Sequence, residues 1–286
     1  MTALEASYAH CRAVAKARAK NFYYSFILLD DERRDSMCAM YAFMRYCDDL
    51  SDELGATRAV LEQWRQALDQ ALSGRLPDDP IWPAFADSVE RYRIPHQYFH
   101  EMIDGVESDL EPVRVDTFEQ LYAYCYRVAS VVGLTTIHIF GFTDPQALAL
   151  AEKCGIAFQL TNILRDVRED AGLGRQYIPN EDMVRFGVVP AELAAGLRTE
   201  RFVNLMEFEV ERAQSYYRDS EPLLGMTEAS SRPALWAMIA IYRGLLGMIA
   251  ESPAEVLMRR VSLPLAEKLW IVLRACLPAM SRHAGS

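Results

Sequence analysis

The hydrophobic and polar positions of this chain follow the 3.6-residue period of α-helices almost throughout. Convincing two-residue alternation, which is typical of half-buried strands, is absent, and glycine and proline fall mostly in short connections. The pattern predicts helices at about residues 3–20, 33–53, 57–73, 81–92, 95–109, 117–140, 145–168, 190–219, 231–249 and 264–280. We therefore predict an all-α protein.

Three segments are apolar on nearly every helical face: 37–50, 122–140 and 233–249. Helices of this kind lie inside a larger bundle, so a polar residue on one of them needs a partner. No long linker rich in Ser, Gly or Pro divides the chain, and we expect one domain over residues 1–286. No apolar run is long enough to predict a membrane-spanning helix, and no signal peptide is indicated.

The composition supports a large core and narrows the choice of partners. Hydrophobic residues make up 51% of the chain and charged residues 24%, with a formal net charge of −10. Such an acidic surface disfavours nucleic acid as a partner, and an anionic substrate would need cations to bind. The six cysteines form no CxxC pair, which fits a reduced, cytoplasmic compartment.

A first polar stripe lies on the apolar segment near residue 45. Tyr41, Arg45, Asp48 and Asp52 are spaced i, i+4, i+7 and i+11, so they share one face of a helix. Asp48 and Asp52 are one turn apart and could bind one hard cation together. Taken alone, the pair is more typical of a solvated acidic helix end.

A second stripe follows about 110 residues later, after another apolar run. Gln159, Asn162, Asp166 and Asp170 are spaced i, i+3, i+7 and i+11. A polar helix end before the turn at Gly172 explains this stripe alone equally well. If the two stripes face each other, however, their repulsion requires bound cations, and Mg²⁺ prefers such oxygen ligands. The combination predicts a site for Mg²⁺ and a diphosphate.

Basic, amide and hydroxyl-bearing residues on or near these stripes are candidate ligands for the diphosphate. They are Arg45, Lys20 with the following Asn21 and Ser25, Gln159, Arg165, Arg175 and Tyr177. Each arginine alone is more simply explained by a surface ion pair, but as a set they could bind phosphate. Tyr126 and Tyr242 lie on helices of buried type and could stabilise a carbocation, unless they are ordinary core aromatics with satisfied hydroxyls.

These residues resemble the squalene/phytoene synthase family over roughly residues 5–275. The most specific segments are YAFMRYCDDLSD at 41–52, YCYRVA at 124–129, QLTNILRDVRED at 159–170 and GRQYIP at 174–179. The resemblance implies an isoprenoid-synthase-type helical bundle around a central cavity. It further implies that Mg²⁺ is bound by Asp48, Asp52, Asn162, Asp166 and Asp170, and that Tyr41, Arg45, Tyr126 and Tyr242 act in the reaction site. Asn21 departs from the Ser found in many members.

The reaction implied by the resemblance is an Mg²⁺-dependent head-to-head (1′–1) condensation of two prenyl diphosphates. Two farnesyl diphosphates giving presqualene diphosphate, as in bacterial hopanoid-pathway members, is the first expectation, and NADPH would be needed only to continue to squalene. Phytoene synthesis from two geranylgeranyl diphosphates is the alternative. Rivals are a terpene cyclase or head-to-tail prenyltransferase, and a non-catalytic assembly protein that retains the fold.

The segment 259–277 mixes basic and apolar residues. It predicts either transient contact with a membrane surface or a last amphipathic helix packed on the bundle. We accordingly expect a cytoplasmic protein, with peripheral contact to the inner face of the membrane.

Overall fold

The computed structural model describes residues 2–19, 22–52, 57–110 and 113–277, with the side chains of residues 51 and 52 excepted. Helices account for 75% of the chain, and the described part contains no strand, so the all-α prediction is confirmed. In chain order the helices are α1 (Ala3–Arg18), α2 (Tyr23–Phe26), α3 (Asp31–Asp52), α4 (Arg58–Leu72), α5 (Trp82–Arg91), α6 (Gln97–Ser108), α7 (Phe118–Cys125), the π-helix η1 (Tyr126–Ser130), α8 (Val131–Phe140), α9 (Gln146–Gly172), α10 (Asn180–Phe186), α11 (Pro190–Ala194), α12 (Glu200–Asp219), α13 (Leu223–Met226), α14 (Arg232–Glu251), the 3₁₀-helix η2 (Pro253–Leu257) and α15 (Leu265–Ala275).

Short polar side chains fix where several helices begin. Thr2 and Glu5 form a capping box at the start of α1, with the Glu5 carboxylate 2.7 Å from the Thr2 amide. Thr117 and Thr199 accept hydrogen bonds from backbone amides in the first turns of α7 and α12. These contacts satisfy amides that have no partner within the helix. Side chains close in sequence therefore determine where these helices begin.

Two helix predictions require correction. The helix expected over 190–219 is two helices, α11 and α12, because the chain turns at Gly196 with a φ of 67°. The helix expected over 117–140 is continuous but contains the π-helix η1 between α7 and α8. A π-turn holds more residues than an α-turn and so rotates the faces on either side of it. The short helices α2, α10 and α13 were not predicted, because four to seven residues carry too little periodicity.

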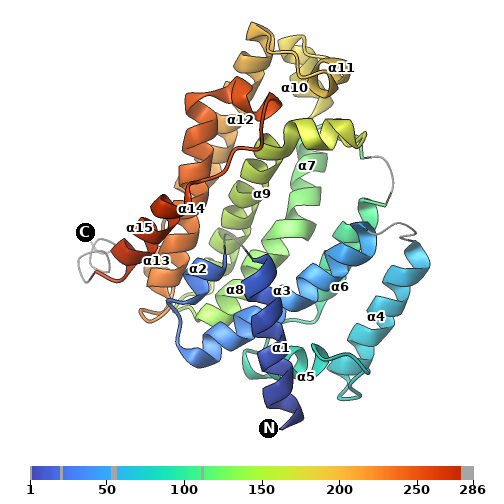
Figure 1. Cartoon of the computed structure of the whole chain (residues 1–286), viewed down its shortest axis with the longest axis vertical. Coiled ribbons are helices and arrows are strands. Elements are labelled where there is room, and N and C mark those ends of the chain that lie inside the picture. The colour runs from blue at the N-terminus through green and yellow to red at the C-terminus, as the bar shows by residue number, and fades with distance from the viewer. Residues whose placement is uncertain (1, 20–21, 53–56, 111–112, 278–286) are drawn as a thin grey trace.

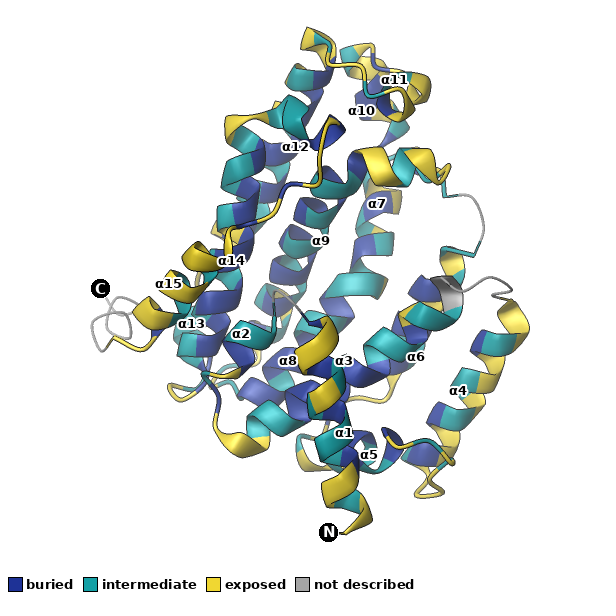
Figure 2. Cartoon of the chain, in the orientation of Figure 1, coloured by how far each residue is buried: buried dark blue, intermediate teal, exposed yellow. Residues whose placement is uncertain are grey.

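The buried side chains form two clusters that meet near α9. One contains stacked aromatic rings from α3 to α6, with Phe43 and Phe85 4.5 Å apart between ring centroids. The other surrounds α9, α12 and α14. Phe22 and Phe158 pack against both clusters. Figure 1 shows α9 running through the middle of the molecule, and Figure 2 shows its buried residues there, with exposed residues concentrated on outer helices such as α4 and α15.

Helix α14 meets the length and composition expected of a membrane-spanning helix, but 56% of its apolar window is buried within the protein. A core helix meets the same criteria. Ile241 and Tyr242 on this helix line an internal cavity, described below. We assign α14 to the core.

Helix α9 approaches η1 so closely that glycine is required at the contact. A Cβ added to Gly155 would lie 2.6 Å from the Cα of Ser130 and 2.8 Å from the carbonyl oxygen of Ala129. We predict that Gly155→Ala lowers the free energy of unfolding by about 2 kcal/mol or more, because backbone atoms must shift. The matched control is Gly247→Ala in α14, where an added Cβ has nothing within 4 Å. Urea denaturation should show no loss for this control, and equal stabilities of the two variants would contradict the close approach.

A buried ionic cluster joins α10 to α12. The Arg212 guanidinium donates to Asp182 at 2.8 Å and to Glu209 at 2.7 Å, so two carboxylates share one cation. Burial raises the pKa of Glu209 to about 8, an effect that Asp182 reinforces and Arg212 opposes. The folded protein therefore binds this proton more tightly than the unfolded chain does.

This cluster predicts a pH dependence of stability. A carboxyl whose pKa is raised on folding stabilises the fold at low pH, and this contribution is lost as the pH rises from 4.5 towards about 8. We expect Glu209→Gln to remove more than about 1 kcal/mol of this decline, since one pKa unit corresponds to about 1.4 kcal/mol. Urea denaturation across this pH range measures both proteins. Parallel curves would show that Glu209 titrates normally.

Candidate functional site

A cavity of about 720 Å³ lies where the two clusters meet. Its wall includes residues of α2, α3, η1, α8, α9 and α14, together with residues 260–263 and Lys268 near the C-terminus. On both α3 and α9 the lining changes from apolar to polar towards the C-terminus of the helix. Met37 and Met40 precede Arg45 and Asp48 on α3, and Cys154 precedes the polar residues of α9. The cavity thus combines an apolar interior with charged groups contributed by two helices.

Three residues of the first predicted stripe, Tyr41, Arg45 and Asp48, line this cavity. The Arg45 guanidinium bonds to Asp49, one turn further along α3, and the Arg45 Nε is buried without a hydrogen-bond partner. Arg18 of α1 contacts the same Asp49 at 3.2 Å. Asp49 therefore holds two arginines beside the cavity. The side chain of Asp52 lies outside the described residues.

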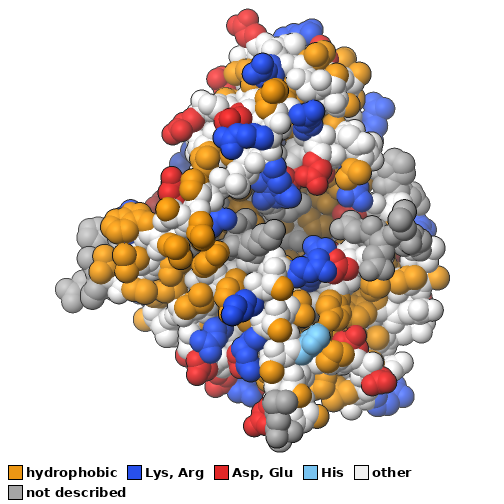
Figure 3. All heavy atoms as spheres, in the orientation of Figure 1, with side chains coloured by type: hydrophobic (Ala, Val, Ile, Leu, Met, Phe, Trp, Pro, Cys, Tyr) orange, Lys and Arg blue, Asp and Glu red, His pale blue; other side chains and the backbone are white. Residues whose placement is uncertain are grey.

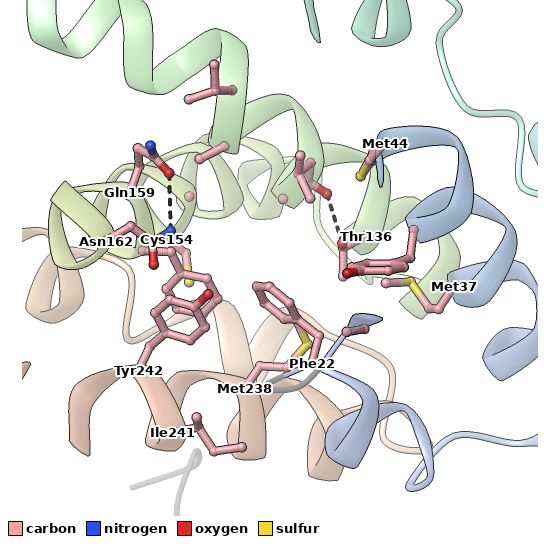
Figure 4. Close-up of a pocket in the computed structure, with 18 of the residues that line it drawn as sticks. Phe22, Met37, Met44, Thr136, Cys154, Gln159, Asn162, Met238, Ile241 and Tyr242 are labelled. Atoms are coloured by element: carbon pink, nitrogen blue, oxygen red, sulfur yellow. Dashed lines mark hydrogen bonds between the residues drawn. The ribbon is translucent and has the colours of Figure 1, made fainter. Parts of the chain in front are cut away.

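The second predicted stripe reaches the same cavity from α9. Gln159 and Asn162 line it, and the Asn162 amide nitrogen donates to the Gln159 side-chain oxygen at 3.2 Å. The Asn162 side-chain oxygen is buried and has no hydrogen-bond partner. Figure 4 shows Gln159, Asn162 and Tyr242 together at one side of the cavity, with Met37 and Met44 of α3 at the other. The two stripes thus contribute polar groups to one space.

Asp166 lies just beyond the cavity lining, between two arginines. Arg165 donates to it through Nε at 2.8 Å, and Arg260 approaches it through Nε at 3.0 Å. Both arginines line the cavity. The Arg165 and Asp166 side chains are only 12% and 17% exposed, so their charges are poorly screened by solvent. Asp166 is thereby fixed at the edge of the cavity.

Asp170, the last carboxylate of the second stripe, has a raised pKa because it is buried and lies near other carboxylates. Burial raises its pKa to about 7, and the neighbouring Asp166 adds to the shift while Arg175 opposes it. A bound divalent cation would offset such crowding, and the unpartnered oxygen of Asn162 offers a further ligand. Within the described residues, no three or more His, Cys, Asp or Glu side chains lie close enough together to bind a metal ion by themselves. The oxygen-donor set nevertheless fits a hard cation such as Mg²⁺ that is bound jointly with a substrate phosphate.

The charges around the cavity favour an anionic ligand despite the negative net charge of the protein. Among the described lining residues, five are basic and one, Asp48, is acidic; the basic residues are Arg18, Arg45, Arg165, Arg260 and Lys268. Burial lowers the pKa of Lys268, and the positive charge of Arg165 lowers it further. Figure 3 shows a hollow in this face of the molecule with basic and acidic side chains at its edge. An anion in this hollow would relieve the repulsion among these cations.

Aromatic rings cover part of the cavity wall. Tyr242 stacks on Phe158 at 4.3 Å between ring centroids and on Phe22 at 5.3 Å. Burial raises the pKa of Tyr242 to about 12, an effect that the positive charge of Arg165 and a hydrogen bond with Asn162 oppose, so its hydroxyl stays protonated. The π-faces of such rings stabilise cations in a water-poor space.

Several predicted site residues lie away from the cavity lining. The Ser25 hydroxyl donates to the Phe22 carbonyl within its own turn, and the Tyr126 hydroxyl donates to Glu101 at 3.0 Å. Tyr126 is turned away because it begins the π-helix η1, whereas later residues of that segment, such as Ala129, do line the cavity. Lys20 and Asn21 lie outside the described residues.

Arg175 and Tyr177 join a second polar cluster beside Asp170. Tyr177 and Tyr124 stack at 4.8 Å between centroids and donate to the two oxygens of Asp109, at 2.8 and 3.1 Å. Arg175 approaches the Asp109 carbonyl oxygen. The sequence analysis gave no role to Tyr124 or Asp109, although Tyr124 opens one of the segments that carry the family resemblance. These residues surround the outer end of the second stripe.

The basic residues contributed from distant parts of the chain were also missed. Arg18 ends α1, and Arg260 and Lys268 belong to the segment 259–277, for which the sequence predicts either contact with a membrane surface or a last amphipathic helix packed on the bundle. Arg260 is 94 residues from its partner Asp166. No local pattern could reveal this pairing, since it depends on how the C-terminal segment crosses the end of α9.

Comparison with known sequences agrees with this site. Residues 15–267 match the family model described as squalene/phytoene synthase. The chain is 34% identical to a 15-cis-phytoene synthase of Synechococcus elongatus over 284 residues, which cover 94% of this chain and 92% of the relative. It is 35% identical to the chloroplastic phytoene synthase 1 of Zea mays, over 93% of this chain and 67% of that protein.

Comparison with solved structures gives the same result for the fold. A dehydrosqualene synthase solved with a ligand superposes with a TM-score of 0.86 at 30% identity, covering 95% of this chain and 96% of the other. The squalene synthase HpnC from Alicyclobacillus acidocaldarius superposes with a TM-score of 0.81 at 26% identity, covering 87% and 94% of the two chains.

Proposed function

Because the chain belongs to the squalene/phytoene synthase family, whose members are prenyltransferases that condense two prenyl diphosphates head to head, we propose that its substrates are two molecules of farnesyl diphosphate. The proposed product is presqualene diphosphate. The observation that carries the proposal is the cavity with basic side chains beside an apolar interior, which matches an anionic head on a hydrocarbon chain.

The site residues would divide the work between the diphosphate and the hydrocarbon. Arg45, Arg165, Arg260 and Lys268 would bind phosphate oxygens, and the arginines can do so with two parallel hydrogen bonds. Asp48, Asp166, Asp170 and Asn162 would hold Mg²⁺, with Asp52 as a further candidate. The bound cation supplies Lewis-acid stabilisation of the negative charge that develops on the departing diphosphate. Divalent metal is used for diphosphate binding in this family, and its ligands here are part of our proposal.

The chemistry would start when the C1–O bond of the donor breaks and leaves an allylic cation. The acceptor's double bond attacks this cation, and loss of a proton closes the cyclopropane ring of presqualene diphosphate. Phe22, Phe158 and Tyr242 would shield the cation from water and stabilise it through their π-faces. This half of the reaction uses no reductant, so NADPH would enter only if the enzyme continues to squalene.

A second candidate uses longer chains. The curated relatives cited above are named phytoene synthases and are 34–35% identical to this chain, which favours two geranylgeranyl diphosphates as substrates. The structural relatives named dehydrosqualene and squalene synthases favour the C15 substrate at 30% and 26% identity. Both candidates share the same site and the same 1′–1 coupling.

Incubation with one prenyl diphosphate at a time separates the candidates. With Mg²⁺ and farnesyl diphosphate we expect pyrophosphate release and a C30 product, identified by mass spectrometry with and without NADPH. Turnover of geranylgeranyl diphosphate alone to a C40 product would establish the second candidate. A C15 hydrocarbon from farnesyl diphosphate would indicate a terpene cyclase. Absence of pyrophosphate release with either substrate would favour a non-catalytic assembly protein.

A further inference from the structure

The outer side of α15 carries the densest group of exposed apolar side chains on the described part of the chain. We call this group the α15 face; it consists of Leu265, Leu269, Trp270, Leu273 and Leu277, each 50–56% exposed. Seven other large hydrophobic residues of the described chain are comparably exposed, and they are scattered over residues 27–258. Figure 3 shows hydrophobic side chains gathered over the α15 region, beside the hollow of the cavity.

The opposite side of α15 is already used by the fold. The helix packs against α14 and α2, Ala275 is buried, and Lys268 lines the cavity. Figure 2 shows α15 at the edge of the molecule with most of its residues exposed. A surface helix normally presents polar residues on the side away from the core. Apolar residues on both sides therefore indicate that α15 contacts something besides its own bundle.

The charges around the α15 face identify the chemistry of its partner. Residues 258–277 contain four basic residues and one acidic residue, in a chain whose formal net charge is −10. Arg260 and Lys268 line the cavity, so the cations beside the α15 face are Arg259 and Arg274. Arg259 precedes the helix, pairs with Glu255 and is 58% exposed, while Arg274 lies near the end of the helix and over the ring of Trp236. Cations at both ends of an apolar face match the acyl chains and anionic headgroups of a lipid surface. In a symmetric dimer formed through this face, the same cations would meet like charges.

We propose that the α15 face binds the surface of an anionic lipid bilayer, with its leucines and Trp270 at the level of the headgroups and upper acyl chains. The cavity would then lie one helix away from the hydrocarbon. This arrangement suits an enzyme whose substrates are amphiphilic and whose product is lipid-like, a role that rests on the function proposed above. Binding to the bilayer itself requires no turnover.

Vesicle flotation with the full-length chain tests the proposal. The probes are vesicles of phosphatidylcholine alone and vesicles of phosphatidylcholine with phosphatidylglycerol in equal parts. We expect the wild type to float with the anionic vesicles, and the double variant Leu269→Glu with Trp270→Ser to bind at least about tenfold more weakly. The matched control is Val184→Glu with Val189→Ser, which changes two comparably exposed apolar residues elsewhere and should bind like the wild type.

Tryptophan fluorescence gives an independent readout. Of the four tryptophans, Trp82 is buried, Trp64 packs within the same aromatic cluster, and Trp236 is half-buried beneath Arg274. Trp270 is 56% exposed. Anionic vesicles should shift the emission to shorter wavelength in the wild type, and Trp270→Phe should remove most of this shift. Circular dichroism of each variant checks that the helical fold is retained.

Three outcomes would overturn the proposal: no binding of the wild type to anionic vesicles, equal binding of the α15-face variant and the wild type, or a dimer in sedimentation that the α15-face variant converts to monomer without any vesicle binding. Activity on detergent-dispersed farnesyl diphosphate is measured in parallel. Full activity without vesicle binding would refute only the proposed binding of the α15 face to a bilayer. Vesicle binding without activity would refute only the proposed reaction.

Discussion

Asp166→Asn and Asp48→Asn are each expected to lower Mg²⁺-dependent diphosphate release by about a hundredfold or more, because each change removes a negative ligand from the proposed metal site. Asp48 lines the cavity from α3, and Asp166 is fixed at its edge by Arg165 and Arg260. The loss should appear mainly in kcat, since the charge to be stabilised develops as the diphosphate departs. A pyrophosphate-release assay at several Mg²⁺ concentrations measures it.

The control for these variants is Asp104→Asn, which breaks an ion pair with Arg65 on the exposed side of α6, opposite Met102 and Val106, which line the cavity. It should leave turnover unchanged, since exposed ion pairs contribute little. Circular dichroism should be the same for all three variants. If Asp48→Asn or Asp166→Asn turned over like the wild type, that aspartate would not be a ligand of the proposed metal site.

Arg165→Lys is expected to lower kcat/KM by about a hundredfold, although it preserves the charge. The Arg165 side chain is 12% exposed and engages Asp166 through two nitrogens, a geometry that an ammonium group cannot reproduce. If the guanidinium also binds the diphosphate, both substrate binding and positioning of Asp166 are impaired. Steady-state kinetics with farnesyl diphosphate separates kcat from KM.

A conservative change at an exposed arginine provides the comparison. Arg201→Lys alters an ion pair with Glu192 in which the arginine is 56% exposed, and we expect normal kinetics. Equal kcat/KM for Arg165→Lys and the wild type would show that residue 165 acts only as a positive charge. It would then have no specific role in binding phosphate.

The polar stripes could be predicted because they are local features of long helices. Residues spaced by three or four positions on α3 and α9 lie on one helical face whatever the rest of the chain does. Asn162, Gln159, Arg45 and Asp48 therefore line one cavity once the fold places the two helices around the same space. That the two stripes face each other was a hypothesis, which the presence of two such stripes in one chain and the family resemblance supported.

The remaining features depend on tertiary structure. Tyr126 would share a face with Ala129 and Gly133 on a regular α-helix, but the π-helix η1 breaks that register and turns its hydroxyl to Glu101. Arg260 and Lys268 reach the cavity only because the chain after η2 crosses back to α9. Their positions in a basic, amphipathic segment suggested a surface role. In the structure, one side of segment 259–277 faces the cavity and the other side faces solvent.

We propose that the acidic stripes of α3 and α9 bind metal and diphosphate together in one cavity. A crystal structure with Mn²⁺ and farnesyl thiolodiphosphate, read by anomalous scattering, tests it most directly. We expect Mn²⁺ bound to carboxylate or amide oxygens of both stripes, Asp48 on one side and Asn162 or Asp166 on the other, with analogue phosphate oxygens completing the coordination. Manganese confined to surface carboxylates, with no analogue in the cavity, would contradict the account.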